Sequence, residues 1–379
     1  MNKNMMKTFL VLEDGSIYLG QTVAQQQESF QEKAGEVVFN TSHSGYEEIA
    51  TDPSYMNQIV VMTAPMQGNY GIDDHSWESR KIWIHGFVCL QIQNSKTHHE
   101  WVNRLVEHNV PILTEVDTRK LVLHLRNQGT PWGALVKASD EKQALEKAQK
   151  MIEQTRQGET DWVWLSSRKE VQDIPGDLKS GSRIAILDFG CKENIIRELK
   201  SRSSYLRIFS SRATAEQIEQ FQPDGLMLTN GPGDPASVQV APQTIQKFLG
   251  RIPIFGICMG HQVLSIALGG KTYKLKFGHR GANHPIQDKI LNKIYMSSQN
   301  HGYAVDEKTL PDFVKVTHTN LNDQTVAGFF SEKLNCLGIQ YHPESHPGPH
   351  DAVALFDFFT TKMTKSKKDL SHHDNSRTI

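Results

Sequence analysis

The sequence predicts an α/β protein: an N-terminal α/β domain, then a second domain built on an open, mostly parallel sheet flanked by helices. From Arg183 onward, short apolar runs, Gly-rich turns and helical stretches alternate, which is typical of a parallel sheet covered by helices. The chain of 379 residues is also too long for one ordinary core. We therefore expect domains at 1–157 and 183–366, a linker at 158–182 and a polar tail at 367–379.

The first domain is expected to open with strands, because its early apolar runs alternate or continue in the manner of buried strands. Helical periodicity follows, and one helix begins with a carboxylate and ends near Gly129. The linker contains Gly158, Pro175 and Gly181, which interrupt both periodicities. The predicted strands are 8–12, 17–19, 35–40, 58–63 and 86–91, and the predicted helices are 100–108, 117–127 and 139–157.

In the second domain we expect strands at 184–187, 225–228 and 252–257, with helices at 193–200 and 260–268. Each strand leads into a distinctive turn. The turns are Asp188-Phe189-Gly190, the Gly-rich run 230–235, and Cys258. Since ligands of such sheets bind beyond the carboxyl ends of the strands, we expect the functional site at this edge.

Composition excludes several function classes. The chain is 38% apolar and 22% charged with a formal charge of −1, so it has no electrostatic footprint for nucleic acid or an acidic membrane surface. Its apolar runs are too short to span a membrane, and Glu13 and Asp14 interrupt the first of them before a signal segment could form. We expect a cytoplasmic protein.

The cysteines Cys89, Cys191, Cys258 and Cys336 form no CxxC pair, which disfavours a zinc ribbon or a disulfide framework. The clusters 98–100 and 372–374 contain histidines and a carboxylate but no second pair at ligand spacing, so no metal site is expected. Gly270-Lys271-Thr272 resembles the end of a P-loop, yet Ser265 stands where that motif requires glycine. ATP binding by this chain is therefore not expected.

Cys258 is the strongest candidate for a nucleophile. It lies between a predicted strand and a predicted helix, in the turn Gly256-Ile257-Cys258-Met259-Gly260. Two glycines permit a sharp turn that exposes the central side chain, and a helix N-terminus favours a thiolate. The N–H of Met259 could form half of an oxyanion hole. Taken alone, these residues fit a buried cysteine beside a Gly-rich helix start equally well.

A candidate base follows another predicted strand, where residues 337–341 lead into His342-Pro343-Glu344. Pro343 biases His342 toward extended geometry, in which side chains two residues apart project to the same side. Glu344 could then orient His342 and complete a cysteine-histidine-carboxylate triad. Without Cys258 this segment would be interpreted as a polar turn. The run 230–235 could complete the oxyanion hole, or it could be a tight turn without a ligand.

These motifs resemble those of the class I glutamine amidotransferases over about 183–360, through Gly-Ile-Cys-Met-Gly-His-Gln at 256–262 and His-Pro-Glu at 342–344. Other segments are similar to the carbamoyl-phosphate synthase small-subunit family along nearly the whole chain. Those segments are 12–15, 35–42, 45–49, 51–55, 68–71, 117–119, 276–281, 283–285, 298–306 and 347–351. Cys191 stands where that family more typically has alanine, which we interpret as a packing substitution.

The resemblance implies that Cys258 attacks the side-chain amide of glutamine, that His342 transfers the protons and that Glu344 orients His342. The implied fold is that of the class I amidotransferases. Ser42 would reach the site from the N-terminal domain, which implies a site at a domain interface. The glutamine contacts implied by matching positions are Ser42, Gly231, Gly233, Met259, Gln262, Asn300, Gly302 and Tyr303.

The resemblance also implies a partner: a large synthetase subunit, in a heterodimer or a higher oligomer, that binds ATP, Mg²⁺ and bicarbonate. That subunit would receive ammonia through a tunnel and make carbamoyl phosphate for arginine or pyrimidine synthesis. No cofactor is implied on this chain, and neither nucleic acid nor a membrane is expected as a partner. Two alternatives remain: a glutaminase serving a different synthetase, and an inactive amidotransferase-like scaffold. The N-terminal segments disfavour the first, and the complete triad disfavours the second.

Overall fold

The computed structural model describes residues 6–93, 95, 100–158 and 160–363. The chain forms two compact units, and each is described by itself. The first comprises Met1–Thr160 with Lys276–Gly281, and the second comprises Asp161–Leu275 with Ala282–Ile379. The predicted tail 367–379 and the histidines of the clusters 98–100 and 372–374 lie outside the described residues.

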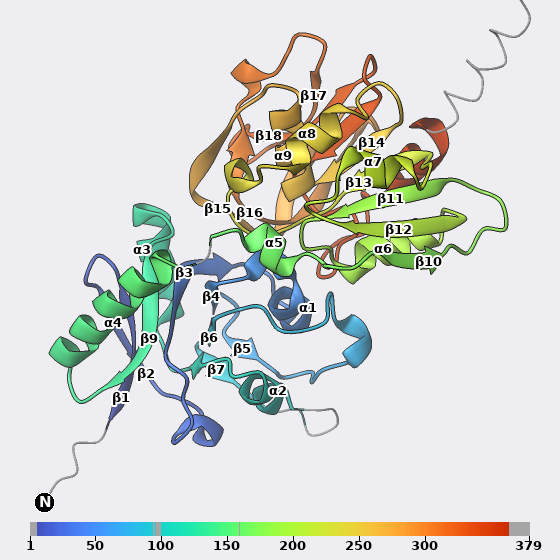
Figure 1. Ribbon diagram of the computed structural model, residues 1–379. Coiled ribbons are helices and arrows are strands. Elements are labelled where there is room, and N and C mark those ends of the chain that lie inside the picture. Colours follow the sequence, from blue (N-terminus) through green and yellow to red (C-terminus); the bar gives the residue numbers. More distant parts are fainter. Residues whose placement is uncertain (1–5, 94, 96–99, 159, 364–379) are drawn as a thin grey trace, which may run out of the picture. The chain divides into compact units, whose positions relative to one another are not determined.

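The first unit is built on a sheet in the order β2-β1-β9-β3-β4-β6-β8 (Figure 1). β3, β4, β6 and β8 run parallel, whereas β2, β1, β9 and β3 pair antiparallel. The run Ile59, Val60 and Val61 in β4 is fully buried, as expected for a parallel strand covered on both faces. The strands are β1 (Lys7–Leu12), β2 (Ile17–Gly20), β3 (Lys33–Asn40), β4 (Gln58–Met62), β5 (Met66–Gln67), β6 (Gly86–Val88), β7 (Gln91–Ile92), β8 (Ile112–Leu113) and β9 (Trp132–Ala138).

Carboxylate caps begin two helices of this unit. Asp117 accepts a hydrogen bond from Lys120 N, and Asp140 accepts one from Gln143 N, each at 2.9 Å. The helices are α1 (Tyr46–Thr51), α2 (Trp101–Glu107), α3 (Thr118–Gln128) and α4 (Glu141–Arg156), with the 3-10 turns η1 (Ala24–Gln26), η2 (Pro53–Tyr55) and η3 (Asp74–Ser76).

The second unit is built on a larger sheet in the order β10-β12-β11-β13-β14-β19-β18-β17-β15-β16. β12, β11, β13, β14 and β19 are parallel and form its middle. At one side of the sheet, β10 pairs antiparallel with β12. At the other side, β18 pairs antiparallel with β19, β17 with β18, and β15 with β17. The predicted α/β class is confirmed, and the parallel strands belong to a mixed sheet. The strands are β10 (Gln172–Pro175), β11 (Arg183–Asp188), β12 (Tyr205–Ser210), β13 (Gly225–Leu228), β14 (Ile254–Ile257), β15 (Thr272–Asp288), β16 (Lys293–Val305), β17 (Lys315–Asn320), β18 (Val326–Ser331) and β19 (Cys336–Ile339).

Helices cover both faces of this sheet, because alternate residues of each strand point to opposite faces. Ala185 and Leu187 of β11 share a core with α7, α8 and α9, whereas Ile184 and Ile186 share one with α6 and α10. The helices are α5 (Trp162–Ser166), α6 (Glu193–Lys200), α7 (Ala215–Glu219), α8 (Ala241–Gln246), α9 (Met259–Ala267) and α10 (Ala354–Asp357), with η4 (Pro235–Ser237), η5 (Glu307–Thr309) and the π-helical turn η6 (Phe358–Met363).

The predicted linker and the predicted strand 86–91 differ from their predicted form. Residues 161–182, interpreted from the sequence as linker, belong to the second unit: Val163 of α5 is buried in its core and β10 pairs with β12. The predicted strand 86–91 is divided into β6 and β7, because Gln91 N donates to Pro65 O at 2.9 Å and the chain turns to pair with β5.

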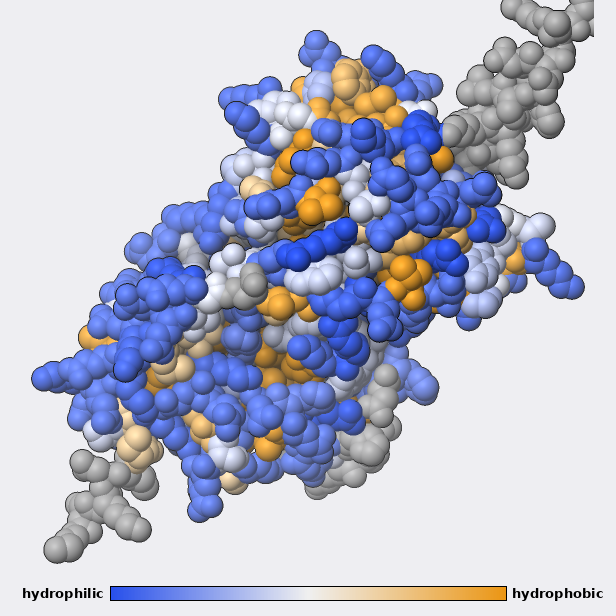
Figure 2. Space-filling view, viewed as in Figure 1, coloured by the Kyte–Doolittle hydropathy of each residue, from blue (hydrophilic) through white to orange (hydrophobic). Residues whose placement is uncertain are grey.

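The face shown in Figure 2 carries mostly hydrophilic residues, with small separate hydrophobic patches. Among the described residues, none of the helices combines the length and the apolar composition that crossing a membrane requires.

Candidate active site

Cys258 occupies the sharp turn between β14 and α9 and has the unusual backbone angles φ 52° and ψ −103°. Two glycines make this turn possible. A Cβ on Gly260 would lie 2.2 Å from Leu228 O, and one on Gly256 would lie 2.6 Å from Gly260 O. Only glycine lets the helix approach the strands this closely. Such a strained, Gly-flanked turn is the geometry of a nucleophile elbow.

The thiol of Cys258 is 2% exposed and donates to Asn300 O, with Sγ and O 3.6 Å apart. The backbone N–H of Cys258 donates to Ile339 O at 2.8 Å, so the turn is tied to β19. Met259 is the first residue of α9, and its N–H has no acceptor within the helix. A sulfur nucleophile and a backbone donor therefore lie at the same helix N-terminus.

His342 and Glu344 are paired at the end of β19, the strand next to β14. His342 Nδ1 and Glu344 Oε1 are 2.7 Å apart, and both side chains are buried. The segment is a turn rather than the predicted extended run, since Ser345 N donates to His342 O at 3.2 Å. This turn brings the carboxylate to one ring nitrogen. The other, Nε2, is buried and has no hydrogen-bond partner within the described part of the chain.

Lys192 completes a buried charged row. Its Nζ lies 3.1 Å from Glu344 Oε1, and the two side chains are 3% and 0% exposed. Asn194 also donates to the backbone carbonyl of Glu344. The sequence patterns gave no role to either residue. The available signal was position, because both follow the Asp188-Phe189-Gly190 turn at the same edge of the sheet as Cys258.

The charged groups in this row shift one another's pKa values. Burial alone would lower the pKa of His342, but the charge of Glu344 and interactions with Cys258 and Glu344 raise that pKa to about 10. Burial would raise the pKa of Glu344, but the positive charges of Lys192 and His342 lower it to about 2. The protonated form of His342 is therefore favoured, and the ring is held in place by an ionised carboxylate.

The Gly-rich loop after β13, residues 230–235, lies beside this turn, because β13 pairs with β14 and Gly260 N donates to Thr229 O at 2.9 Å. It carries the predicted contacts Gly231 and Gly233. A Cβ on Gly231 would lie 2.2 Å from Phe189 O, and Gly233 has φ +90°, so both positions favour glycine.

The other predicted glutamine contacts of the second unit lie on α9 and β16. Gln262 Nε2 donates to Tyr303 O at 2.8 Å and to Gln340 Oε1 at 2.9 Å, which joins α9 to β16. Asn300 and Gly302 are on the same stretch of β16, and Asn300 O accepts the Cys258 thiol. Asn300 Nδ2 is a buried donor without a partner among the described residues, which is the state expected of a group that meets a ligand.

Ser42 lies in the first unit, just after β3. It is buried, and its N–H donates to Asn40 Oδ1 at 2.7 Å. The expectation that it reaches the glutamine site stays a prediction. Within the described residues, no group of three His, Cys, Asp or Glu side chains is arranged to hold a metal ion.

Family models match both parts of the chain. The model of the class-I glutamine amidotransferases matches residues 185–362, and that of the carbamoyl-phosphate synthase small chain, CPSase domain, matches residues 10–135. The carbamoyl phosphate synthase small chain of Chlorobaculum tepidum is 43% identical over 366 residues, which cover 94% of this chain and 98% of the relative. The protein of the same name from Oceanobacillus iheyensis is 42% identical over 373 residues, covering 96% and 98%.

Proposed function

The chain belongs to the carbamoyl-phosphate synthase small-chain family, and from this premise we propose how it acts as the glutamine-hydrolysing subunit of that synthase. One observation carries the proposal: a cysteine at a strained strand-to-helix turn, with a buried His342–Glu344 pair at the end of the adjoining strand. This combination supports nucleophilic attack on an amide.

In the proposed reaction, the proton of Cys258 transfers to His342 Nε2 before glutamine is attacked, and the resulting thiolate Sγ then forms a bond to the amide carbon of glutamine. The raised pKa of His342 favours this transfer. The resulting oxyanion would be held by the N–H of Met259 and by the Gly231–Gly233 backbone. Losing one such donor typically lowers the rate by about 10²–10³-fold.

The tetrahedral intermediate then collapses. The carbon–nitrogen bond breaks, His342 donates its proton to the departing ammonia, and a glutamyl thioester remains on Cys258. His342 next takes a proton from water, and the hydroxide attacks the thioester carbon. The carbon–sulfur bond breaks, glutamate leaves, and the proton on His342 returns to the thiolate.

We propose that the ammonia passes to a large synthetase subunit, and that the ATP, Mg²⁺ and bicarbonate chemistry belongs to that partner. The heterodimer and the ammonia tunnel are part of this proposal. So is a cytoplasmic location, which the four buried free thiols support because such thiols suit a reducing compartment.

The variant Cys258→Ala tests the nucleophile. In the complex with a large subunit it should lose glutamine-dependent synthesis of carbamoyl phosphate and keep synthesis from free ammonia. Cys336→Ala, which truncates a buried thiol on the neighbouring strand β19, is the matched control and should keep both activities. Glutamine hydrolysis that survives in Cys258→Ala would show that the nucleophile is another residue.

A further inference from the structure

The turn from β11 into α6, residues 188–193, touches both halves of the active site. We call it the β11 turn. Lys192 reaches Glu344 with its side chain, and its backbone N–H donates to Asn230 Oδ1 at 3.0 Å. Phe189 N donates to Thr229 Oγ1 at 2.9 Å. The turn is therefore bonded to the triad carboxylate on one side and to the entrance of the Gly-rich 230–235 loop on the other.

Backbone packing joins the β11 turn to that loop directly. Gly190 has φ +127°, and a Cβ there would lie 3.1 Å from Pro232 Cδ and 3.2 Å from Gly231 Cα. On the other side, a Cβ on Gly231 would meet Phe189 O. Main chains this close leave no room for independent movement, so a shift of the β11 turn would shift Gly231 and its N–H group.

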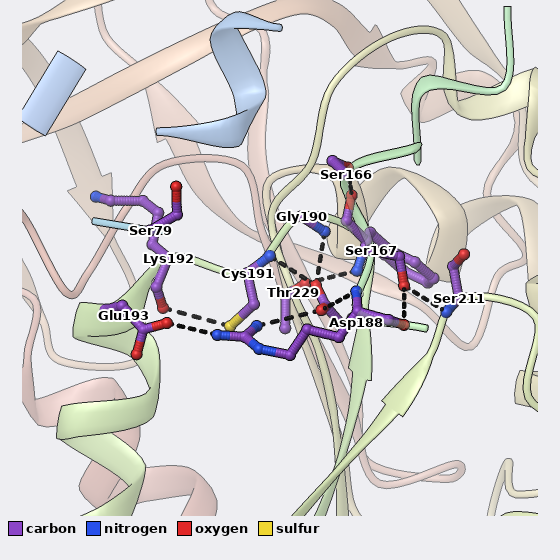
Figure 3. Close-up of polar contacts among 12 residues, drawn as sticks. Ser79, Ser166, Ser167, Asp188, Gly190, Cys191, Lys192, Glu193, Ser211 and Thr229 are labelled. Carbon is purple, nitrogen blue, oxygen red and sulfur yellow. Dashed lines mark hydrogen bonds and ion pairs between the residues drawn. The ribbon is translucent and has the colours of Figure 1, made fainter. Parts of the chain in front are cut away.

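Asp188 fixes the conformation of the β11 turn from a fully buried position. Figure 3 shows its carboxylate facing the backbone of the turn. Oδ1 accepts from Gly190 N at 2.8 Å and from Cys191 N at 2.7 Å. These two bonds fold the chain back around the carboxylate, immediately before Lys192.

Arg168 holds the second oxygen of Asp188. Oδ2 accepts from Arg168 N at 2.8 Å and from Nη1 at 3.2 Å, and Nη2 of the same guanidinium donates to Glu193 Oε1 at 2.5 Å. Arg168 thus bridges the two ends of the β11 turn. It comes from the segment 158–182, which the sequence patterns indicated as a linker.

We propose that Asp188, held by Arg168, is a positioning residue for glutamine hydrolysis. It fixes the conformation of the β11 turn, so that Lys192 remains paired with Glu344 and the N–H groups of the Gly-rich loop remain beside Cys258. Neither Asp188 nor Arg168 contacts the substrate; both act through the β11 turn. The inference rests on the proposed reaction at Cys258.

Asp188→Asn tests the proposal, because the amide keeps the shape of the side chain but its NH₂ cannot accept from Arg168. With the full chain in complex with a large subunit, kcat for glutamine hydrolysis should fall at least about tenfold, while KM stays within about twofold. KM should change little, because most predicted glutamine contacts lie on α9 and β16 and not on the β11 turn. Ammonia-dependent synthesis should be unchanged.

Asp173→Asn is the matched control. Asp173 accepts from Arg207 Nε at 2.7 Å and Nη2 at 2.9 Å, so this change also removes a carboxylate from a two-point arginine pair in the second unit, but on the exposed β10. Its kcat and KM should equal those of the wild type.

If Asp188→Asn does not fold, Arg168→Gln tests the proposal instead. This variant should fold, because the Arg168 side chain is 20% exposed and the backbone N–H of residue 168 still donates to Asp188. It should also lower kcat more than it raises KM. A lower melting temperature with kcat unchanged would make Asp188 a structural residue only and overturn the proposal, as would a rise in KM alone. Wild-type protein that hydrolyses no glutamine would instead overturn the proposed function.

Discussion

At the scale of single residues, the site is a row of buried charges. Lys192, Glu344 and His342 are each almost fully removed from solvent, so each depends on its neighbour for the stabilisation that water would otherwise supply. The pairing favours the positively charged form of His342, and with it the basicity that the proposed proton transfer requires. Stability and activity therefore share one set of contacts.

This coupling predicts a pH dependence of stability. The folded-state pKa of His342 lies above its unfolded value of about 6.5, so its contribution is complete below pH 6.5 and is lost as pH rises toward 10. Glu344→Gln removes the charge that raises this pKa. Relative to the variant, the wild type should lose on the order of 2–4 kcal/mol of unfolding free energy between pH 7 and 10.

Urea unfolding of both proteins at pH 7, 8.5 and 10 measures this difference. The variant serves as the reference for groups that titrate in the same range away from Glu344, whereas Lys192, 3.1 Å from Glu344 Oε1, loses its partner in the variant. Parallel pH profiles for the two proteins would contradict the buried ion pair.

At the scale of elements, the elbow depends on the contact of α9 with β13 and β14. Gly260 is the point of closest approach, because its Cα faces the backbone of Leu228. A helix held this closely keeps Cys258 in its positive-φ conformation and keeps the N–H of Met259 at the turn. Gly269, just beyond the other end of this helix, has no such constraint, because nothing lies within 4 Å of an added Cβ.

Gly260→Ala should displace α9, because the new methyl group would lie 2.2 Å from Leu228 O. We expect destabilisation by about 1–3 kcal/mol and a loss of about 10²-fold or more in kcat. Gly269→Ala is the control: it lies just beyond α9, has φ +93° and has nothing within 4 Å of its added Cβ. That change costs about 1 kcal/mol of strain and should leave kcat intact. Urea unfolding and glutaminase assays separate the two effects, and wild-type kcat in Gly260→Ala would refute the close-contact argument.

At the scale of the whole molecule, the triad and Lys192 lie in the second unit, whereas Ser42 and most of the family-specific N-terminal segments lie in the first. The residues proposed to hydrolyse glutamine thus lie in one unit, and the other unit carries Ser42 and segments similar to the small-chain family. An ammonia-supplying subunit is useful only when its partner is ready, so we expect the partner to control the rate.

The isolated chain should hydrolyse glutamine slowly. A large subunit of the family should raise the rate of hydrolysis by about 5- to 150-fold, which is the effect of a typical coupling free energy between two sites. Glutamate release, measured with increasing large subunit, tests this. A complex assembled with Cys258→Ala provides the background. If large subunits from several members of the family bind but leave the rate unchanged, the proposed control by the partner is wrong.

The sequence by itself determined the features that depend on short stretches of chain. Helix α6 and strand β13 were predicted with their observed bounds, because apolar periodicity and flanking turns are local signals. The elbow and the His-Pro-Glu motif were also recognisable, since each needs particular residues within a few positions, although the motif forms a turn and not the predicted extended run. Strands β15 to β17 were not predicted: many of their residues are polar and partly exposed, and Pro285 lies within β15.

Only the tertiary structure decided which strand ends meet. β14 lies between β13 and β19, which places the thiol, the Gly-rich loop and His342 at one edge of the sheet. The same pairing brings Lys192 from the end of β11 to Glu344, and Arg168 from the segment interpreted as linker to Asp188. Pairing between strands distant in sequence is fixed by hydrogen bonding and burial across the sheet, which a local pattern does not encode. The sequence therefore predicted a nucleophile and its base, whereas the fold placed the charges of Lys192 and Glu344 beside that base.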